Sequence, residues 1–280
     1  MPRRLTVPRR PTVHRRSIAT AIAAAALAPA LLLSGCAASS ATQPTASTGS
    51  ASADTVDGTV TVFAAASLTS SFTALGKAFE SVHPGAKVTF SFAGSSDLVS
   101  QLTEGAPADV FASADEANMA KAVTAKLADG KPVDFATNVL AIAVPPGNPA
   151  KITGFADLAK PGVKTVVCAP QVPCGAATAK VEASSGVTLT PVSQESSVTD
   201  VLGKVESGEA DAGIVYVTDV KGAGSKVASV AFPEASGVVN TYPIVAVAGA
   251  PNPKGAAAFV DFVTGGKGRA VLAAAGFGAP

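Results

Sequence analysis

Residues 58–79 read GTVTVFAAASLTSSFTALGKAF, and their pattern indicates the fold class. Its first six residues are rich in β-branched and aromatic side chains, which favour a strand. After three alanines, apolar side chains recur with the spacing of one helix face, at Leu68, Phe72, Leu75 and Phe79. A strand that passes through a short turn directly into a helix is the repeating unit of an α/β fold with parallel strands.

The same alternation of strand and helix continues to the end of the chain. Further strands are expected at 87–92, 109–112, 139–144, 164–168, 188–192, 213–217, 227–232 and 241–247. Further helices are expected at 97–102, 115–127, 175–184, 198–207, 254–264 and 267–275. Two segments, 108–115 and 210–216, resemble each other, and each brings a strand to its carboxyl end. This echo favours two α/β lobes over one larger sheet.

The turns between strands and helices carry small residues and no Lys, Arg or His. Four of them lie at 64–67, 93–97, 173–175 and 195–198. Each places backbone N–H groups at a helix N-terminus, where the helix dipole favours an anion. Ordinary N-capping is the other interpretation of any single turn. Because all four follow predicted strands at the same end, we expect one shared site in which neutral donors hold a fully deprotonated oxyanion.

Catalytic motifs are lacking in this sequence. His83 is the one histidine after the leader, and it lies in a turn before Pro84 and Gly85. There is no Gly-x-Ser-x-Gly elbow, no Gly-x-x-x-x-Gly-Lys loop and no dinucleotide fingerprint in a suitable context. The acids Asp97, Asp109 and Asp115 are interpreted as helix caps or strand-end residues. We therefore expect binding, not enzymatic activity.

The first 35 residues are predicted to be an export signal. Six of the 21 basic residues lie within positions 1–16, and no acid precedes Asp54. An apolar run too short for a membrane span follows and ends in LSGC at 33–36, which resembles the lipobox of bacterial lipoproteins. That resemblance implies lipidation of Cys36, whereas an ordinary signal with an incidental cysteine is the alternative. The export route, general secretion or twin-arginine, stays open.

The composition of the remaining chain narrows the function further. It is net acidic, at about −5, and the chain has no Trp and two Tyr, so nucleic acid is not an expected partner. Residues 36–57 are mostly Ala, Ser and Thr and are predicted to be a tether. Cys168 and Cys174 are expected to form a disulfide outside the cytoplasm. Free thiols or a metal site are the alternatives, although zinc requires four ligands.

Four motifs of the body resemble those of the molybdate-binding proteins of ABC importers. They are TVFAAASL at 61–68, SFAGSS at 91–96, GAPADVF at 105–111 and GIVY at 213–216. The similarity extends from about residue 58 to residue 280. It implies the two-lobed type II solute-binding fold, in which each lobe is a mainly parallel sheet flanked by helices and the ligand cleft lies between the lobes.

The resemblance also implies the residues of the site. The family holds a tetrahedral oxyanion with two serine hydroxyls, two backbone amides of the second lobe and a tyrosine hydroxyl. By motif, these positions are Ser67, Ser95, Cys174, Val198 and Tyr216. Cys174 stands where the family commonly has alanine, and its backbone amide is still a donor. The implied ligand is molybdate or tungstate, with no cofactor and no directly coordinated metal cation.

Together these observations predict an organisation and a role. The expected segments are a signal peptide at 1–35, a tether at 36–57, lobe 1 at 58–146 and 239–280, and lobe 2 at 147–238. We expect a monomeric lipoprotein, anchored to the outer face of the cell membrane, that captures molybdate or tungstate and delivers it to an ABC permease. The alternatives are the same fold with sulfate or phosphate, a surface hydrolase, and a structural lipoprotein.

Overall fold

The stretch that opens the fold forms a strand, a 3₁₀ turn and a helix, as its pattern predicts. Strand β1 is Asp57–Ala65, the turn η1 is Ala66–Leu68, and helix α1 is Thr69–Val82. The apolar face of α1, which includes Phe72 and Phe79, is buried. The hydrophobic spacing alone therefore orients this helix against the sheet.

The computed structural model describes residues 55–280, which fall within one compact unit. The predicted signal peptide, the lipidation site Cys36 and nearly all of the tether lie outside these residues. Within the described part of the chain, none of the helices has the length and apolar character needed to cross a membrane.

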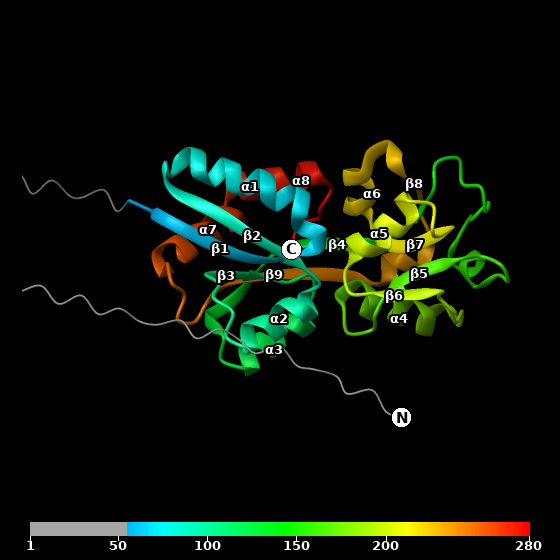
Figure 1. Ribbon diagram of the computed structural model, residues 1–280, viewed down its shortest axis with the longest axis horizontal. Helices are drawn as coiled ribbons and strands as arrows, with labels where there is room; N and C mark the ends of the chain where they lie inside the picture. Colours follow the sequence, from blue (N-terminus) through cyan, green and yellow to red (C-terminus); the bar gives the residue numbers. More distant parts are fainter. Residues whose placement is uncertain (1–54) are drawn as a thin grey trace, which may run out of the picture. The chain divides into compact units, whose positions relative to one another are not determined.

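The strands form two sheets that meet along β4 (Figure 1). In lobe 1 the strands are β1, β2 (Gly85–Ala93), β3 (Val110–Ala112) and β9 (Val239–Val247). In lobe 2 they are β5 (Thr165–Cys168), β6 (Ser193–Glu195), β7 (Ala212–Tyr216) and β8 (Ala228–Val230). Strand β4 (Ala128–Val144) pairs with β9 over its first part and with β7 and β8 near its end. The spatial order is β2-β1-β3-β9-β4-β7-β5-β6.

The predicted α/β class is confirmed, with one refinement of strand direction. In each lobe the strands that alternate with helices are parallel, namely β1 with β2 and β3, and β5 with β6 and β7. Strands β4 and β9 run antiparallel to their neighbours. They pair with each other along most of β9, and the end of β4 continues into the second sheet beside β7 and β8.

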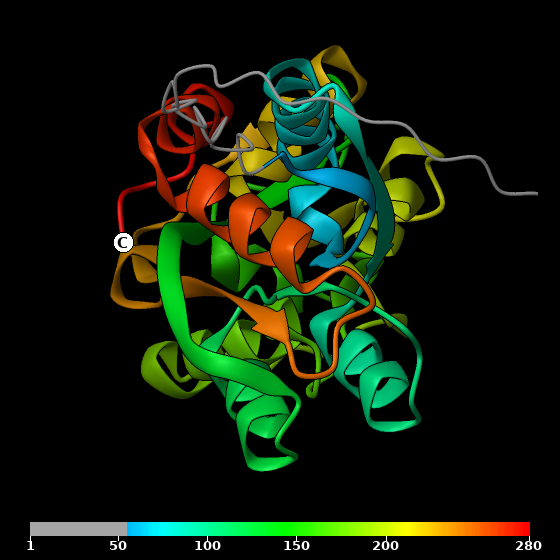
Figure 2. The same ribbon diagram turned by 90° about the vertical axis from the view of Figure 1, so that its left-hand side faces the viewer.

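Helices cover both faces of the sheet in lobe 1 (Figures 1 and 2). On one face lie α1, α7 (Pro253–Thr264) and α8 (Gly266–Ala275), and on the other lie α2 (Ser95–Thr103) and α3 (Glu116–Thr124). Successive side chains of β1 point to opposite faces of the sheet. Val62 therefore packs in the core with α1, α7 and α8, and Phe63 packs in the core with α2 and α3.

Lobe 2 buries a single apolar core around β4, β5 and β7. Its helices are α4 (Pro173–Ser185), α5 (Val198–Glu206) and α6 (Val217–Ala223). The prediction of a strand at 188–192 is wrong. The edge strand is β6, which is the polar segment Ser193–Glu195. Leu189 is buried in the loop that precedes β6, so its apolar character serves packing and not strand pairing.

Candidate functional site

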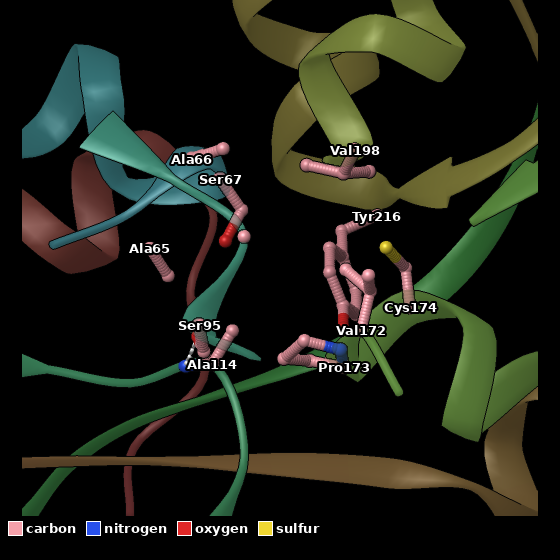
Figure 3. Close-up of a pocket in the computed structure, with 11 residues that line it drawn as sticks. Ala65, Ala66, Ser67, Ser95, Ala114, Val172, Pro173, Cys174, Val198 and Tyr216 are labelled. Atoms are coloured by element: carbon pink, nitrogen blue, oxygen red, sulfur yellow. Dashed lines mark hydrogen bonds between the residues drawn. The ribbon is translucent and has the colours of Figure 1, made fainter. Parts of the chain in front are cut away.

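A small buried pocket lies between the two lobes and brings together all five predicted site residues (Figure 3). Lobe 1 contributes Ala65, Ala66, Ser67, Gly94, Ser95 and Ala114, and lobe 2 contributes Val172, Pro173, Cys174, Val198 and Tyr216. The cavity volume is about 10 Å³, far below the ~300–1,000 Å³ typical of sites for drug-sized ligands. The pocket therefore suits a small ion.

Helix starts supply most of the pocket wall. Ser67 lies in η1 just before α1, and Ser95 is the first residue of α2. Cys174 follows Pro173 in the first turn of α4, and Val198 is the first residue of α5. The first N–H groups of a helix have no partner within it, and the dipole makes this end partly positive. The wall thus offers backbone donors without any cationic side chain.

Close backbone contacts require glycine at two places beside the pocket. A Cβ on Gly175 would lie 2.0 Å from the carbonyl oxygen of Ala169, so the start of α4 can approach the end of β5 only with glycine there. A Cβ on Gly94 would lie 2.2 Å from the carbonyl oxygen of Ser196, across the boundary between the lobes. Glycine at these positions lets the walls close on a small volume.

The hydroxyl groups of the pocket also interact with protein groups on the side away from the cavity. The Ser95 Oγ accepts a hydrogen bond from the Ala114 N–H at 3.0 Å, which leaves the serine hydrogen available to the pocket. The Tyr216 Oη accepts from Asn240 Nδ2 at 3.0 Å. The Ser67 Oγ lies 3.1 Å from the Tyr242 Oη. Burial raises the pKa of both tyrosines above the usual range, so both remain neutral donors at physiological pH.

The lining carries no charged side chain, but a buried acid lies behind it. Asp219 on α6 accepts a hydrogen bond from the Tyr216 N–H at 2.8 Å. Burial raises the pKa of its carboxyl to about 7. Asp219 is therefore partly protonated near neutral pH, which reduces its repulsion of an anion in the pocket.

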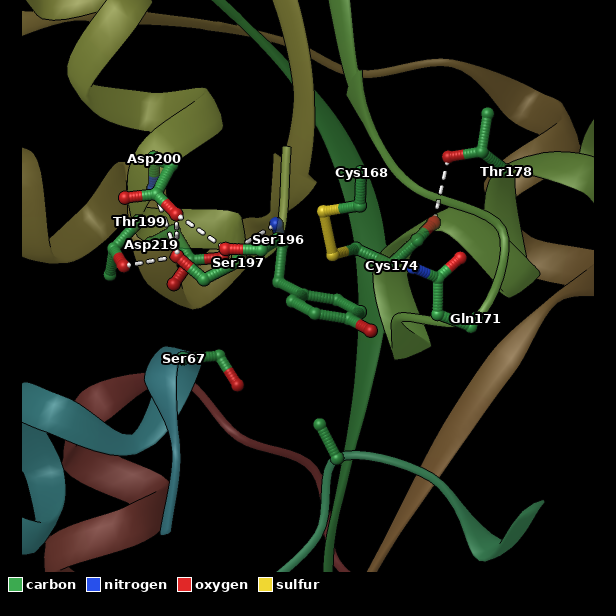
Figure 4. The surroundings of a disulfide bond; sticks show 12 residues. Ser67, Cys168, Gln171, Cys174, Thr178, Ser196, Ser197, Thr199, Asp200 and Asp219 are labelled. Carbon is green, nitrogen blue, oxygen red and sulfur yellow. Dashed lines mark hydrogen bonds between the residues drawn. A yellow bond between two sulfur atoms is a disulfide. The ribbon is translucent and has the colours of Figure 1, made fainter. Parts of the chain in front are cut away.

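The two cysteines of the body are joined in a disulfide (Figure 4). Their Cα atoms lie 5.7 Å apart, and the bond ties the last residue of β5 to the first turn of α4. Neither sulfur remains as a thiolate, so the alternatives of free thiols and a metal site do not apply to this state. Cys174 lines the pocket, and its side chain joins the start of α4 to Cys168.

The remaining candidates from the sequence have structural roles. Asp109 accepts from the N–H groups of Thr61 and Asn252, and Asp115 caps α3 by accepting from the Asn118 N–H. His83 ends α1 and packs against the ring of Phe79. Asp109 and Asp115 match the expectation that these acids cap helices or lie at strand ends, and His83 matches the expected turn before Pro84.

Sequence reasoning missed the residues behind the pocket. Asn138, Asn240 and Tyr242 are buried and hydrogen-bonded to one another or to the lining. The sequence did contain one indication. Both asparagines are polar residues next to apolar runs, and an amide buried there needs hydrogen-bond partners. Nothing in the sequence indicated which partners these were.

The fold and the pocket define a class: a two-lobed binding protein that encloses one small ligand between its lobes. A family profile described as bacterial extracellular solute-binding protein matches residues 60–278. The molybdate-binding protein ModA of Mycobacterium tuberculosis H37Rv is 52% identical over 221 residues, covering 79% of this chain and 85% of that protein. ModA of Escherichia coli K12 is 36% identical, covering 82% and 91%.

A solved structure gives the same result. The periplasmic molybdate-binding protein of Azotobacter vinelandii superposes with a TM-score of 0.70 at 25% identity, covering 79% of this chain and 99% of that one. The chain belongs to the family of bacterial extracellular solute-binding proteins, within its molybdate-binding ModA group.

Proposed function

We propose that this protein is an extracytoplasmic receptor that captures molybdate between its lobes and hands it to an ABC permease. The observation that carries the proposal is the pocket itself, which is small, has no charged side chain in its lining, and includes three hydroxyl residues and the starts of α4 and α5. The two relatives described above, which cover 79% and 82% of this chain, are named as molybdate-binding proteins, and this supports the same ligand here.

In this proposal five groups hold the anion. The hydroxyls of Ser67, Ser95 and Tyr216 and the backbone amides of Cys174 and Val198 each donate one hydrogen bond. A hydrogen bond to a charged group contributes roughly 1.5–3 kcal/mol. Five such bonds are ample for tight binding after the costs of closure and desolvation.

This donor set favours a fully deprotonated tetrahedral oxyanion, and the named relatives favour molybdate within that class. Molybdate and tungstate are tetrahedral dianions of nearly the same size, so we propose that both bind. Hydrogen phosphate carries a proton that would need an acceptor, and the proposed groups are all donors. The protein binds and releases its ligand without changing it, so we propose no enzymatic activity and no cofactor.

The organisation of the chain belongs to the same proposal. Lobe 1 comprises 58–146 and 239–280, lobe 2 comprises 147–238, and β4 and β9 act as the hinge between them. The signal at 1–35, lipidation of Cys36 and a tether to residue 57 hold a monomer at the outer face of the membrane. Metabolic labelling with palmitate tests the anchor: Cys36→Ala should lose the label and release the protein into the medium.

Calorimetric titration of residues 51–280 with molybdate, tungstate, sulfate and phosphate tests the binding function. We expect 1:1 binding of the first two anions and far weaker binding of the others. Ser67→Ala and Ser95→Ala should each weaken molybdate binding by about 10- to 150-fold. Ser81→Ala, an exposed serine on α1, is the matched control and should bind normally. Absence of binding to every oxyanion would refute the proposal.

A further inference from the structure

Two buried asparagines face each other where the chain passes between the lobes. Asn138 of β4 and Asn240 of β9 are direct partners in the antiparallel register. One residue further on, Val139 and Val239 form the last pair of β4 with β9, and Leu140 already pairs with β7. A buried amide is costly unless its donors and its acceptor are satisfied. The hydrogen-bond partners of these two asparagines therefore indicate how each amide is oriented.

The side chain of Asn240 has one possible orientation. Its Nδ2 donates to the carbonyl oxygen of Ala114 at 2.8 Å, and a carbonyl can only accept, so the nitrogen must face that way. The second Nδ2 hydrogen points to the Tyr216 Oη at 3.0 Å. The Tyr216 oxygen therefore accepts a hydrogen bond from Asn240 on the side away from the pocket. Its own hydrogen is left for the Tyr242 hydroxyl, with which it also interacts, or for a ligand.

Asn138 is oriented by a backbone group as well. Its Oδ1 accepts from the Val139 N–H at 3.0 Å, which turns the Nδ2 toward the Thr218 Oγ1 at 2.8 Å and the Tyr242 Oη at 3.4 Å. An amide nitrogen cannot accept, so Asn138 does not take the Tyr242 hydrogen. The Tyr242 Oη lies 3.1 Å from the Ser67 Oγ, a pair in which either hydroxyl can donate, and we take Tyr242 as the donor. The Ser67 hydrogen is then free to point into the pocket.

We propose that Asn138 and Asn240 are positioning and specificity-determining residues, which fix the hydroxyls of Tyr216 and, through Tyr242, of Ser67 as donors toward the ligand. This inference rests on the proposed oxyanion-binding function. It adds a reason for selectivity: the Tyr216 oxygen already accepts from the Asn240 amide, so it has one acceptor position fewer for the proton of hydrogen phosphate.

The same bonds couple hydroxyl orientation to closure of the lobes. Asn240 links Ala114 of lobe 1 to Tyr216 of lobe 2. Asn138 links Thr218 of lobe 2 to Tyr242, which contacts Ser67 of lobe 1. The full set of inward-pointing donors therefore exists only when the lobes are together, which is the state that encloses the ligand.

Asn240→Leu is the first test, because leucine has a similar size and no donor. Molybdate affinity should fall by about 10- to 100-fold. The ratio of molybdate to phosphate affinity should fall as well, because the Tyr216 oxygen regains an acceptor position for the proton of hydrogen phosphate. In a Tyr216→Phe background, Asn240→Leu should have no further effect on molybdate affinity. A merely structural role would weaken both anions alike and would act equally in the Phe background.

Tyr242→Phe tests the second branch with a change that the core tolerates more readily. Its molybdate affinity should fall about tenfold, with the same loss of discrimination against phosphate. Asn252→Ala is the control, because it removes a bonded asparagine at the start of α7, away from the pocket, and should keep both affinities. Unchanged anion ratios in Asn240→Leu and Tyr242→Phe, in a protein whose wild type binds molybdate, would overturn the inference. Failure of the wild type to bind molybdate would refute the proposed function itself.

Discussion

Replacement of Gly94 by alanine should prevent the lobes from closing while leaving each lobe intact. Gly94 precedes α2 with φ −58° and ψ 140°, a conformation that alanine adopts without strain. The added Cβ would lie 2.2 Å from the Ser196 carbonyl oxygen and 3.4 Å from the Val172 Cγ1, and both of these residues belong to lobe 2. The clash is therefore between the lobes and not within one of them.

The size of the effect follows from the geometry. A carbon and an oxygen in contact need more than about 3 Å, so the lobes must separate by roughly 1 Å along this line. A hydrogen bond stretched by 1 Å beyond about 2.9 Å is no longer made. Loss of the two amide donors of lobe 2, at Cys174 and Val198, would remove roughly 3–6 kcal/mol of binding free energy. Molybdate affinity should therefore fall by about 10²- to 10⁴-fold.

Calorimetry with molybdate measures the affinity, and thermal unfolding without ligand checks the fold. Gly203→Ala is the matched control, because it lies in α5 with open space around its Cβ position. That control should bind normally and be more stable by about 0.5–1 kcal/mol. Molybdate binding by Gly94→Ala within threefold of wild type would show that the enclosed arrangement is not the binding state. A large loss of stability without ligand would show instead that the clash damages a lobe.

Two further variants probe the surroundings of the pocket. The double change of Cys168 and Cys174 to serine should lower the free energy of unfolding by about 2 kcal/mol, because it opens a short loop in the unfolded chain. Urea denaturation measures this difference, and wild-type protein in reductant should show the same loss. An unchanged urea midpoint would contradict this account. Because burial raises the pKa of Asp219 to about 7, its contribution to stability is full below its usual range and is lost as pH rises through 7. Asp219→Asn should have a flatter dependence of melting temperature on pH between 4 and 7, and an unchanged slope would assign the dependence to other groups.

The parts of the fold that the sequence predicts are those determined by local pattern. The segment from β1 to α1 is one example, because its helix face and its strand run are both visible within 22 consecutive residues. Strand β6 is the opposite case: Ser193–Glu195 has no apolar residue, and it pairs with β5 at the edge of the sheet. The pairing partner determines this strand, and that partner is separated from it in the sequence by helix α4.

Strand β4 shows why boundaries of long strands are hard to predict. The apolar run 139–144 was expected, but the strand begins at Ala128 and includes Gly130 and Pro132. The register of β4 with β9 shifts between Asp129 and Val133, which accommodates residues that are unfavourable in a regular strand. Pairing with β9, about a hundred residues away, supplies what the local sequence lacks.

The residues of the site likewise fall into those that local sequence predicts and those that depend on distant pairing. The turns that carry Ser67 and Ser95 could be recognised because each helix start is a local signal. Asn138 and Asn240 could not, because their function depends on a register between two strands far apart in the sequence. Polar residues beside an apolar run show that partners must exist, but only the three-dimensional structure identifies them.

Neutral donors also suit a receptor that must release its ligand. The starts of α2, α4 and α5 each carry about half a positive charge, comparable in sum with one or two cations. A lysine or arginine would attract a dianion over many ångströms, since Coulomb energy falls only with the first power of distance. Hydrogen bonds are lost over about 1 Å. A site built from Ser67, Ser95 and the lobe 2 amides can therefore bind tightly when closed and lose most of that affinity after a small opening, which is the behaviour that delivery to a permease requires.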